Sequence, residues 1–318
     1  RPAAVARPSA TIPAAPLSGA EMRARFRDGK AALLEHFRVS RPTTTSATQL
    51  MRGLARHVDA TLTLLWQQSG MPAGAALLAV GGYGRGELFP YSDVDVLVLL
   101  PAGEAAAQAA QEAVPAFITA CWDIGLEIGS SVRTVAECVA EAQRDVTSQT
   151  AMLESRLLCG ARKLFNAFRT QTDAAMDPAA FLRAKTLEMR QRQIKYEDTP
   201  YSLEPNCKES PGGLRDLQVV VWVARAASLG RTWGELAAKG LITPFEVKQL
   251  QRHEGALKLI RCRLHLVAGR REDRLVFDLQ TAVAESFGYH ATKTERASEV
   301  LMHRYYWAAK AVTQLNQI

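Results

Sequence analysis

The sequence predicts an α+β protein, in which a small mixed sheet flanked by helices comes first and an all-helical region follows. Short apolar runs at residues 77–80, 94–100 and 126–132 have the length of strands and are bounded by glycine, proline or polar residues. Patterns with helical spacing lie before and between these runs. After about residue 160 strand patterns nearly vanish, and long helical patterns continue to the end.

The first half can be followed element by element. Ser46 and Gln49 have the spacing of a capping box, and apolar residues then recur at helical spacing up to residue 66. The first strand pattern ends abruptly at two glycines, and residues 83–92 are expected to form a loop. An alanine-rich helix is expected at residues 104–122, before the last strand pattern.

The second half is expected to be helical. Thr243 and Glu246 flank a proline at the first helical position, which is a strong signal for the start of a helix. Thr292 and Glu295 repeat this spacing and are expected to begin the last helix. We therefore expect a disordered lead-in at residues 1–20, a mixed domain with N-terminal helices at 21–160 and a helical domain at 161–318.

Composition and charge exclude several classes of protein. No apolar run approaches the roughly 18 to 20 residues that a membrane span needs. The formal net charge is +7, and residues 1–60 supply +6 of it because they hold ten Lys or Arg against four Asp or Glu. The rest of the chain is nearly neutral, so neither nucleic acid nor a membrane is an expected partner. The five cysteines include no CxxC pair, which is typical of reduced thiols in a cytoplasmic protein.

Asp93 and Asp95 are the clearest candidates for catalysis. On a strand they would point to the same face, while Val94 and Val96 enter the core. Two carboxylates this close repel each other unless a cation lies between them. Mg²⁺ prefers such oxygens together with substrate phosphates, so this pair is a candidate metal site. The alternative is a pair of acids on an exposed strand face.

A glycine-rich turn lies ten residues upstream, in the run GGYGRG that begins at Gly81. Its glycines allow tight turns, its exposed N–H groups could hold phosphate oxygens, and Arg85 adds a guanidinium suited to phosphate. The run is neither a Walker loop nor a dinucleotide-binding GxGxxG motif. Together with the two aspartates it favours a phosphate-transferring enzyme.

A third carboxylate could complete the cluster from a neighbouring strand. Glu127, between apolar residues, is the first candidate, although an ion pair with Arg133 explains it equally well. Glu154 is the reserve candidate. Its segment looks helical, however, and a bracing ion pair with Arg156 is the simpler interpretation.

A second glycine-bearing segment, residues 205–216, lies in the helical half. Ser210 and Pro211 are expected to cap a helix that runs to about residue 227. Lys208 and Arg215 would reinforce anion binding at its N-terminus, as part of a lid over a triphosphate. An interdomain turn is the alternative.

These motifs together resemble a known family. GGYGRGELFPYSDVDVLVL resembles the signature of the DNA polymerase β-like nucleotidyltransferases. LEIGSSVRT, LESRLL and, above all, SPGGLRDL are similar to the bifunctional uridylyltransferase/uridylyl-removing enzymes that modify the bacterial nitrogen-signalling protein PII. The resemblance covers nearly everything after residue 20.

The resemblance implies a fold and a reaction. Residues 21–160 would be a DNA polymerase β-like nucleotidyltransferase domain that transfers UMP from UTP to a tyrosine hydroxyl of PII and releases pyrophosphate. Asp93 and Asp95 would hold two Mg²⁺ ions, with Glu127 as a third catalytic carboxylate. The nucleotide would contact a wider set of residues: Gly81, Gly82, Tyr83, Gly84, Arg85, Ser92, Lys208, Gly212, Gly213 and Arg215. Family members are longer, so the chain is expected to be an N-terminal part without the UMP-removing and glutamine-sensing domains.

Three other functions stay open on the sequence alone. An adenylyltransferase that acts on glutamine synthetase would prefer ATP, although the PGGLRD segment argues against it. A catalytically silent module would bind nucleotide or PII without releasing pyrophosphate. A nucleic-acid-modifying transferase would show salt-dependent binding to RNA.

Overall fold

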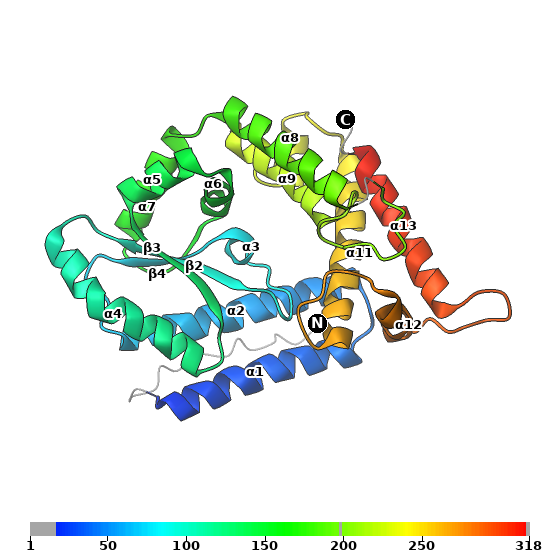
Figure 1. The fold of residues 1–318 in the computed structure, drawn as a ribbon, viewed down its shortest axis with the longest axis horizontal. Coiled ribbons are helices and arrows are strands. Elements are labelled where there is room, and N and C mark those ends of the chain that lie inside the picture. The colour runs from blue at the N-terminus through cyan, green and yellow to red at the C-terminus, as the bar shows by residue number, and fades with distance from the viewer. Residues whose placement is uncertain (1–16, 197–198, 316–318) are drawn as a thin grey trace, which may run out of the picture.

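A small mixed sheet forms one end of the computed structural model, which describes residues 17–196 and 199–315 (Figure 1). Its strands, in the order β3-β2-β1-β4, are β1 (Ala76–Ala79), β2 (Val94–Leu100), β3 (Ile128–Thr134) and β4 (Arg156–Gly160). β1 is antiparallel to β2 and β4, whereas β2 and β3 are parallel. The predicted fold class is confirmed.

Helices surround the sheet and then build the rest of the molecule. Those of the first part are α1 (Gly19–Val39), α2 (Thr44–Gln68), α3 (Gly81–Gly84), α4 (Glu104–Asp123), α5 (Val135–Arg144), α6 (Val146–Leu153) and α7 (Arg162–Ala174). Those of the second part are α8 (Pro178–Lys195), α9 (Leu214–Ala226), α10 (Trp233–Ala238), α11 (Pro244–Ala268), α12 (Phe277–Ser286) and α13 (Ala297–Leu315).

The central strands β1 and β2 are buried on both faces, apart from Asp95, because helices cover each face of the sheet there. Leu77 and Val98 belong to the core that includes residues of α2 and α4, whereas Leu78 and Leu97 belong to a second core with residues of α5, α6 and α7. Burial on both faces explains why β1 and β2 appear in the sequence as continuous apolar runs. The boundary at residues 160 and 161 stays a prediction, and Phe168 of α7, beyond it, still packs into the sheet core.

α2 links the two parts of the molecule. It runs beneath the sheet at one end and reaches α11 at the other (Figure 1). At the sheet end Trp66 meets Phe117 of α4 edge to face, with ring centroids 5.7 Å apart. At the other end a Cβ on Gly255 of α11 would lie 3.0 Å from the Thr44 side chain, so the two helices approach closely.

Some expected elements have different limits. Residues 1–16 of the expected lead-in lie outside the described residues, and Gly19 already begins α1 behind a Ser18 capping box. The segment around Glu154, expected to be helical, turns at that residue and enters strand β4. This prediction was wrong because five residues without clear alternation give no periodic signal.

Three predicted helix starts also differ, and the fourth is confirmed. α2 begins two residues before Ser46, with Thr43 as N-cap. α9 is capped by Gly213 instead of Ser210, and α13 begins at Ala297, after a turn at the predicted cap. Thr243 caps α11 as predicted, with Glu246 completing the capping box. Capping signals locate a turn, but neighbouring serines and threonines compete for the cap itself.

Candidate active site

Asp93 lies directly before β2, and Asp95 is the second residue of this strand. Val94 and Val96 alternate with them and are buried, with 3% and 1% exposure. Asp95 is opposite Gly129 of the parallel neighbour β3. A Cβ on Gly129 would lie 2.5 Å from Asp95 Oδ1, and one on Gly81 would lie 3.6 Å from Oδ2. The Asp95 carboxylate therefore occupies a gap that two glycines leave open.

The electrostatic environment of this pair is mixed. Partial desolvation raises the pKa of Asp95, and the Asp93 charge raises it further, while Lys208 and Arg271 oppose both effects. Arg271, in the loop after α11, forms an ion pair with the exposed Asp93 carboxylate. Sequence reasoning did not select Arg271, because a lone arginine in a polar loop carries no motif.

The glycine-rich turn forms the short helix α3 directly after β1. Gly81 has a φ of 56°, a left-handed conformation that favours glycine. The first N–H groups of a helix have no partners within that helix. Gly81 and Gly82 line a cleft of about 270 Å³ together with Asp93 and Asp95. This arrangement suits an anionic ligand beside the carboxylates.

Two other residues of the turn have structural contacts. A Cβ on Gly84 would lie 1.9 Å from the backbone oxygen of Glu154, so this glycine permits close packing against the end of α6. Tyr83 is buried, and its hydroxyl donates to Asp59 at 2.5 Å. Its side chain therefore points toward α2, which leaves only its backbone to line the cleft.

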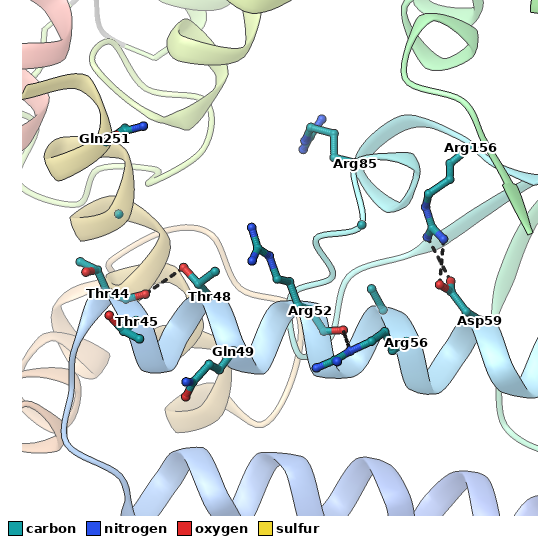
Figure 2. Close-up of a pocket in the computed structure, with 13 residues that line it drawn as sticks. Thr44, Thr45, Thr48, Gln49, Arg52, Arg56, Asp59, Arg85, Arg156 and Gln251 are labelled. Carbon is teal, nitrogen blue, oxygen red and sulfur yellow. Dashed lines mark hydrogen bonds and ion pairs between the residues drawn. The ribbon is translucent and has the colours of Figure 1, made fainter. Parts of the chain in front are cut away.

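Arg85 and Arg156 have partners that differ from those expected. Arg85 pairs with the buried Glu154 at 2.5 Å, and Arg156 pairs with Asp59 at 2.8 Å, so the predicted Glu154–Arg156 pair is wrong. Figure 2 shows Arg85 and the Arg156–Asp59 pair on the wall of a neighbouring cavity of about 800 Å³ above α2. Arg85 lines both this cavity and the cleft.

The opposite wall of the cleft comes from the helical part and is mainly cationic, although it includes Glu188, which pairs with Lys185 at 2.6 Å. Its lysines and arginines are Lys185, Lys208, Arg215, Arg261 and Arg271. Burial lowers the pKa of Lys208, and the charges of Arg215 and Arg261 act in the same direction. Arg215 pairs with Glu209 at 3.0 Å. The structure thus brings the predicted Lys208 and Arg215 to the same cleft as the aspartates, 270 Å³ in volume.

The glycines of the second motif have a packing role. A Cβ on Gly212, whose φ is 77°, would lie 2.2 Å from the backbone oxygen of Ala309 in α13. Asp216 accepts from the Gly212 N–H at 2.8 Å and pairs with Arg192 of α8. Neither Gly212 nor Gly213 is among the residues that line the cleft.

Glu127 lies beside a different cavity. It is exposed just before β3, and with Asp93 and Ser92 it lines a space of about 490 Å³ on the α1 side. Ser92 and Asp93 also line the cleft, so the two spaces meet there. Arg133, the expected alternative partner of Glu127, pairs with Glu141 at 3.7 Å. The role of Glu127 as a third carboxylate stays a prediction.

The carboxylate pair suits a hard cation that takes its other ligands from substrate. Within residues 17–196 and 199–315, no group of three or more His, Cys, Asp or Glu could hold a metal by itself. Mg²⁺ commonly uses one or two carboxylates plus substrate phosphates and water. The repulsion between Asp93 and Asp95, now countered by Arg271, is what such a cation would relieve.

Comparison with known proteins agrees with this geometry. A family model described as GlnD PII-uridylyltransferase matches residues 180–318, and one described as nucleotidyltransferase domain matches residues 64–135. A bifunctional uridylyltransferase/uridylyl-removing enzyme of Cupriavidus pinatubonensis is 60% identical over 302 residues, covering 95% of this chain and 34% of the relative. The second half of the chain is thus similar to the GlnD PII-uridylyltransferase family. An enzyme of the same name from Burkholderia thailandensis is 57% identical over 305 residues, 96% of this chain and 35% of the relative.

The chain spans about a third of the length of the curated relatives it matches. The match at 64–135 contains the glycine turn and both aspartates, and the match at 180–318 contains the cationic wall. All of α1 and most of α2 lie outside both matches. Across the part that the structure describes, no helix has the length and apolar character needed to cross a membrane.

Proposed function

We propose that this chain transfers UMP from UTP to a tyrosine hydroxyl of the PII protein in the cytoplasm, and releases pyrophosphate. The observation that carries the proposal is the convergence of Asp95, the glycine turn and five cations on one cleft. Similarity to nucleotidyltransferase domains supports the nucleotidyl transfer, and similarity to PII-uridylyltransferases supports UTP and PII as substrates.

The proposed binding of the nucleotide follows from the two walls. The N–H groups of Gly81 and Gly82 would donate to the phosphates, as helix N-termini do. Lys208 and Arg271 would neutralise phosphate charge from the other wall, with Arg271 leaving Asp93 when the nucleotide enters. Asp93 and Asp95 would hold Mg²⁺, which when bound supplies further neutralisation of the phosphates.

The transfer itself is a displacement at the α-phosphorus. The tyrosine oxygen forms a bond to this phosphorus as the bond to the β-phosphate oxygen breaks, and pyrophosphate leaves with that electron pair. The phenolic proton passes to a carboxylate of the pair, directly or through water, because a tyrosine with a pKa of about 10 is a weak nucleophile while protonated.

Pyrophosphate release tests the proposal. The chain is incubated with PII and Mg²⁺ and with UTP, ATP, CTP or GTP in turn. We expect PII-dependent release with UTP alone. Release with ATP but not with UTP would instead indicate an adenylyltransferase. Absence of release with every nucleotide, despite UTP binding, would contradict the proposal.

Variants of the two aspartates test the site. Asp93→Ala and Asp95→Ala should each reduce release about 1,000-fold or more, because metal-held charge stabilisation is worth several kcal/mol. Asp123→Ala, which removes an exposed acid at the end of α4, is the matched control and should keep full activity. Circular dichroism checks the fold, and a folded Asp95→Ala variant with normal turnover would refute the assignment.

A further inference from the structure

A second cavity lies next to the candidate active site. It has a volume of about 490 Å³ and shares Leu88, Ser92, Asp93 and Arg271 with the cleft. Gly81, Gly82 and Lys208 line the cleft and not this cavity, whereas Phe26, Lys30 and His57 line this cavity and not the cleft. Asp93 therefore lines both the cleft, which suits phosphates, and a cavity with other lining residues.

The walls of this cavity combine aromatic and apolar groups with five charged side chains, those of Lys30, Asp93, Glu127, Arg270 and Arg271. Phe26 of α1 stacks on His57 of α2, with ring centroids 5.4 Å apart and planes 5° apart. His57 Nε2 lies 2.8 Å from the backbone oxygen of Phe26, which fixes the imidazole against α1. Leu54 and Val58 extend the apolar wall.

Lys30 places a positive charge in this cavity. Its Nζ lies 5.0 Å from the centroid of the Tyr91 ring, a cation–π arrangement. The negative charge of Glu127 acts electrostatically on Lys30. Among the described residues, these two side chains form no ion pair within 4.0 Å. An ammonium group held over a ring keeps donors available for another oxygen, since Lys carries three.

We propose that this second cavity receives the aromatic ring of the acceptor tyrosine, and that Lys30 donates a hydrogen bond to its hydroxyl oxygen. The proposal rests on the proposed function, because it names where the acceptor of that reaction binds. The aromatic and apolar walls suit a ring, and Asp93 and Lys30 supply the polar groups that a phenol needs. A simple aliphatic alcohol would leave most of this wall unused.

The position of the cavity agrees with the direction of attack. The phosphates would lie against the glycine turn and Lys208, on one side of Asp93. The acceptor would approach from the other side, across Asp93, so that pyrophosphate leaves away from it. Lys30 would stabilise the negative charge that grows on the acceptor oxygen as its proton leaves.

The proposal also assigns a role to the N-terminal helices. Phe26, Lys30, Leu54, His57 and Val58 all belong to α1 or α2, and all lie outside the two family-model matches at residues 64–135 and 180–318. The matched segments supply most of the residues that line the phosphate cleft. The helices before them add Phe26, Leu54 and Val58 to the apolar wall of the acceptor cavity.

The first test is the kinetics of Lys30→Met, which keeps much of the side chain but removes its charge. We expect kcat/KM for PII to fall about 10-fold or more, while the KM for UTP stays within about 2-fold of the wild type. Lys30→Arg should recover part of the loss. Arg27→Met, on the exposed face of the same helix, is the matched control and should match the wild type.

A second test does not depend on transfer. N-acetyl-tyrosinamide and N-acetyl-phenylalaninamide are titrated into the protein, and binding is followed by ligand-observed NMR. Tyrosinamide should bind more tightly, and Lys30→Met should remove that preference. Equal binding of both amides to the wild type, or unchanged PII kinetics in folded Lys30→Met, would overturn the acceptor site. Failure of the proposed function would give a different result from failure of the acceptor site, because then even the wild type would release no pyrophosphate.

Discussion

The substitution Gly129→Ala tests the placement of Asp95 without touching a carboxylate. A Cβ at this position would lie 2.5 Å from Asp95 Oδ1, whereas carbon and oxygen atoms normally approach to only about 3.3 Å. The carboxylate would have to move by about 0.8 Å or rotate away from Asp93. Misplacement of about 1 Å in an active site can cost about 100-fold in rate.

We therefore expect kcat to fall about 100-fold, which corresponds to about 2.7 kcal/mol of lost transition-state stabilisation. Stability should not fall, because Gly129 lies within strand β3 and alanine reduces the freedom of the unfolded chain. Gly19→Ala adds the same methyl group where nothing lies within 4 Å and is the control.

The assay is pyrophosphate release with UTP and PII, together with thermal unfolding of each variant. If Gly129→Ala keeps a kcat within about 3-fold of the wild type and melts at the same temperature, catalysis does not depend on the present position of the Asp95 carboxylate. The geometric basis of the site would then be refuted, whatever the effect of Asp95→Ala.

Two further predictions concern stability. Gly212→Ala should lower the free energy of unfolding by about 3 kcal/mol or more, because the φ of 77° strains alanine and the added Cβ would lie 2.2 Å from the Ala309 oxygen. Urea unfolding measures this change. A loss below about 1 kcal/mol would contradict the prediction. Burial opposes ionisation of Asp273, but the hydrogen bond with His265 and the charge of Arg261 outweigh it and hold the pKa of Asp273 well below its usual range. This stabilisation is present above the unfolded-state pKa of about 3.9 and is lost as pH falls further, so wild type and Asp273→Asn should differ more in unfolding free energy at pH 7 than at pH 3. An equal difference at both pH values would show that the charge of Asp273 is unimportant.

The sequence by itself determined the local features of the candidate site. Alternation along β2 is a property of any strand, so Asp93 and Asp95 had to share a face while Val94 entered the core. The run of glycines marked a tight turn for the same local reason, since positive φ is costly for other residues. The narrow motifs then led to the family without any structure.

Tertiary structure decided which distant groups meet these local features. Arg271 reaches Asp93 across 178 residues, and Arg85 turned out to pair with Glu154 across 69 residues. Gly212 looked like part of a phosphate loop, but the packing of α13 against it accounts for its glycine. Periodicity and capping act over a few residues, so they place side chains on faces of an element. The partners of those side chains depend on how the elements pack, and no local pattern encodes that.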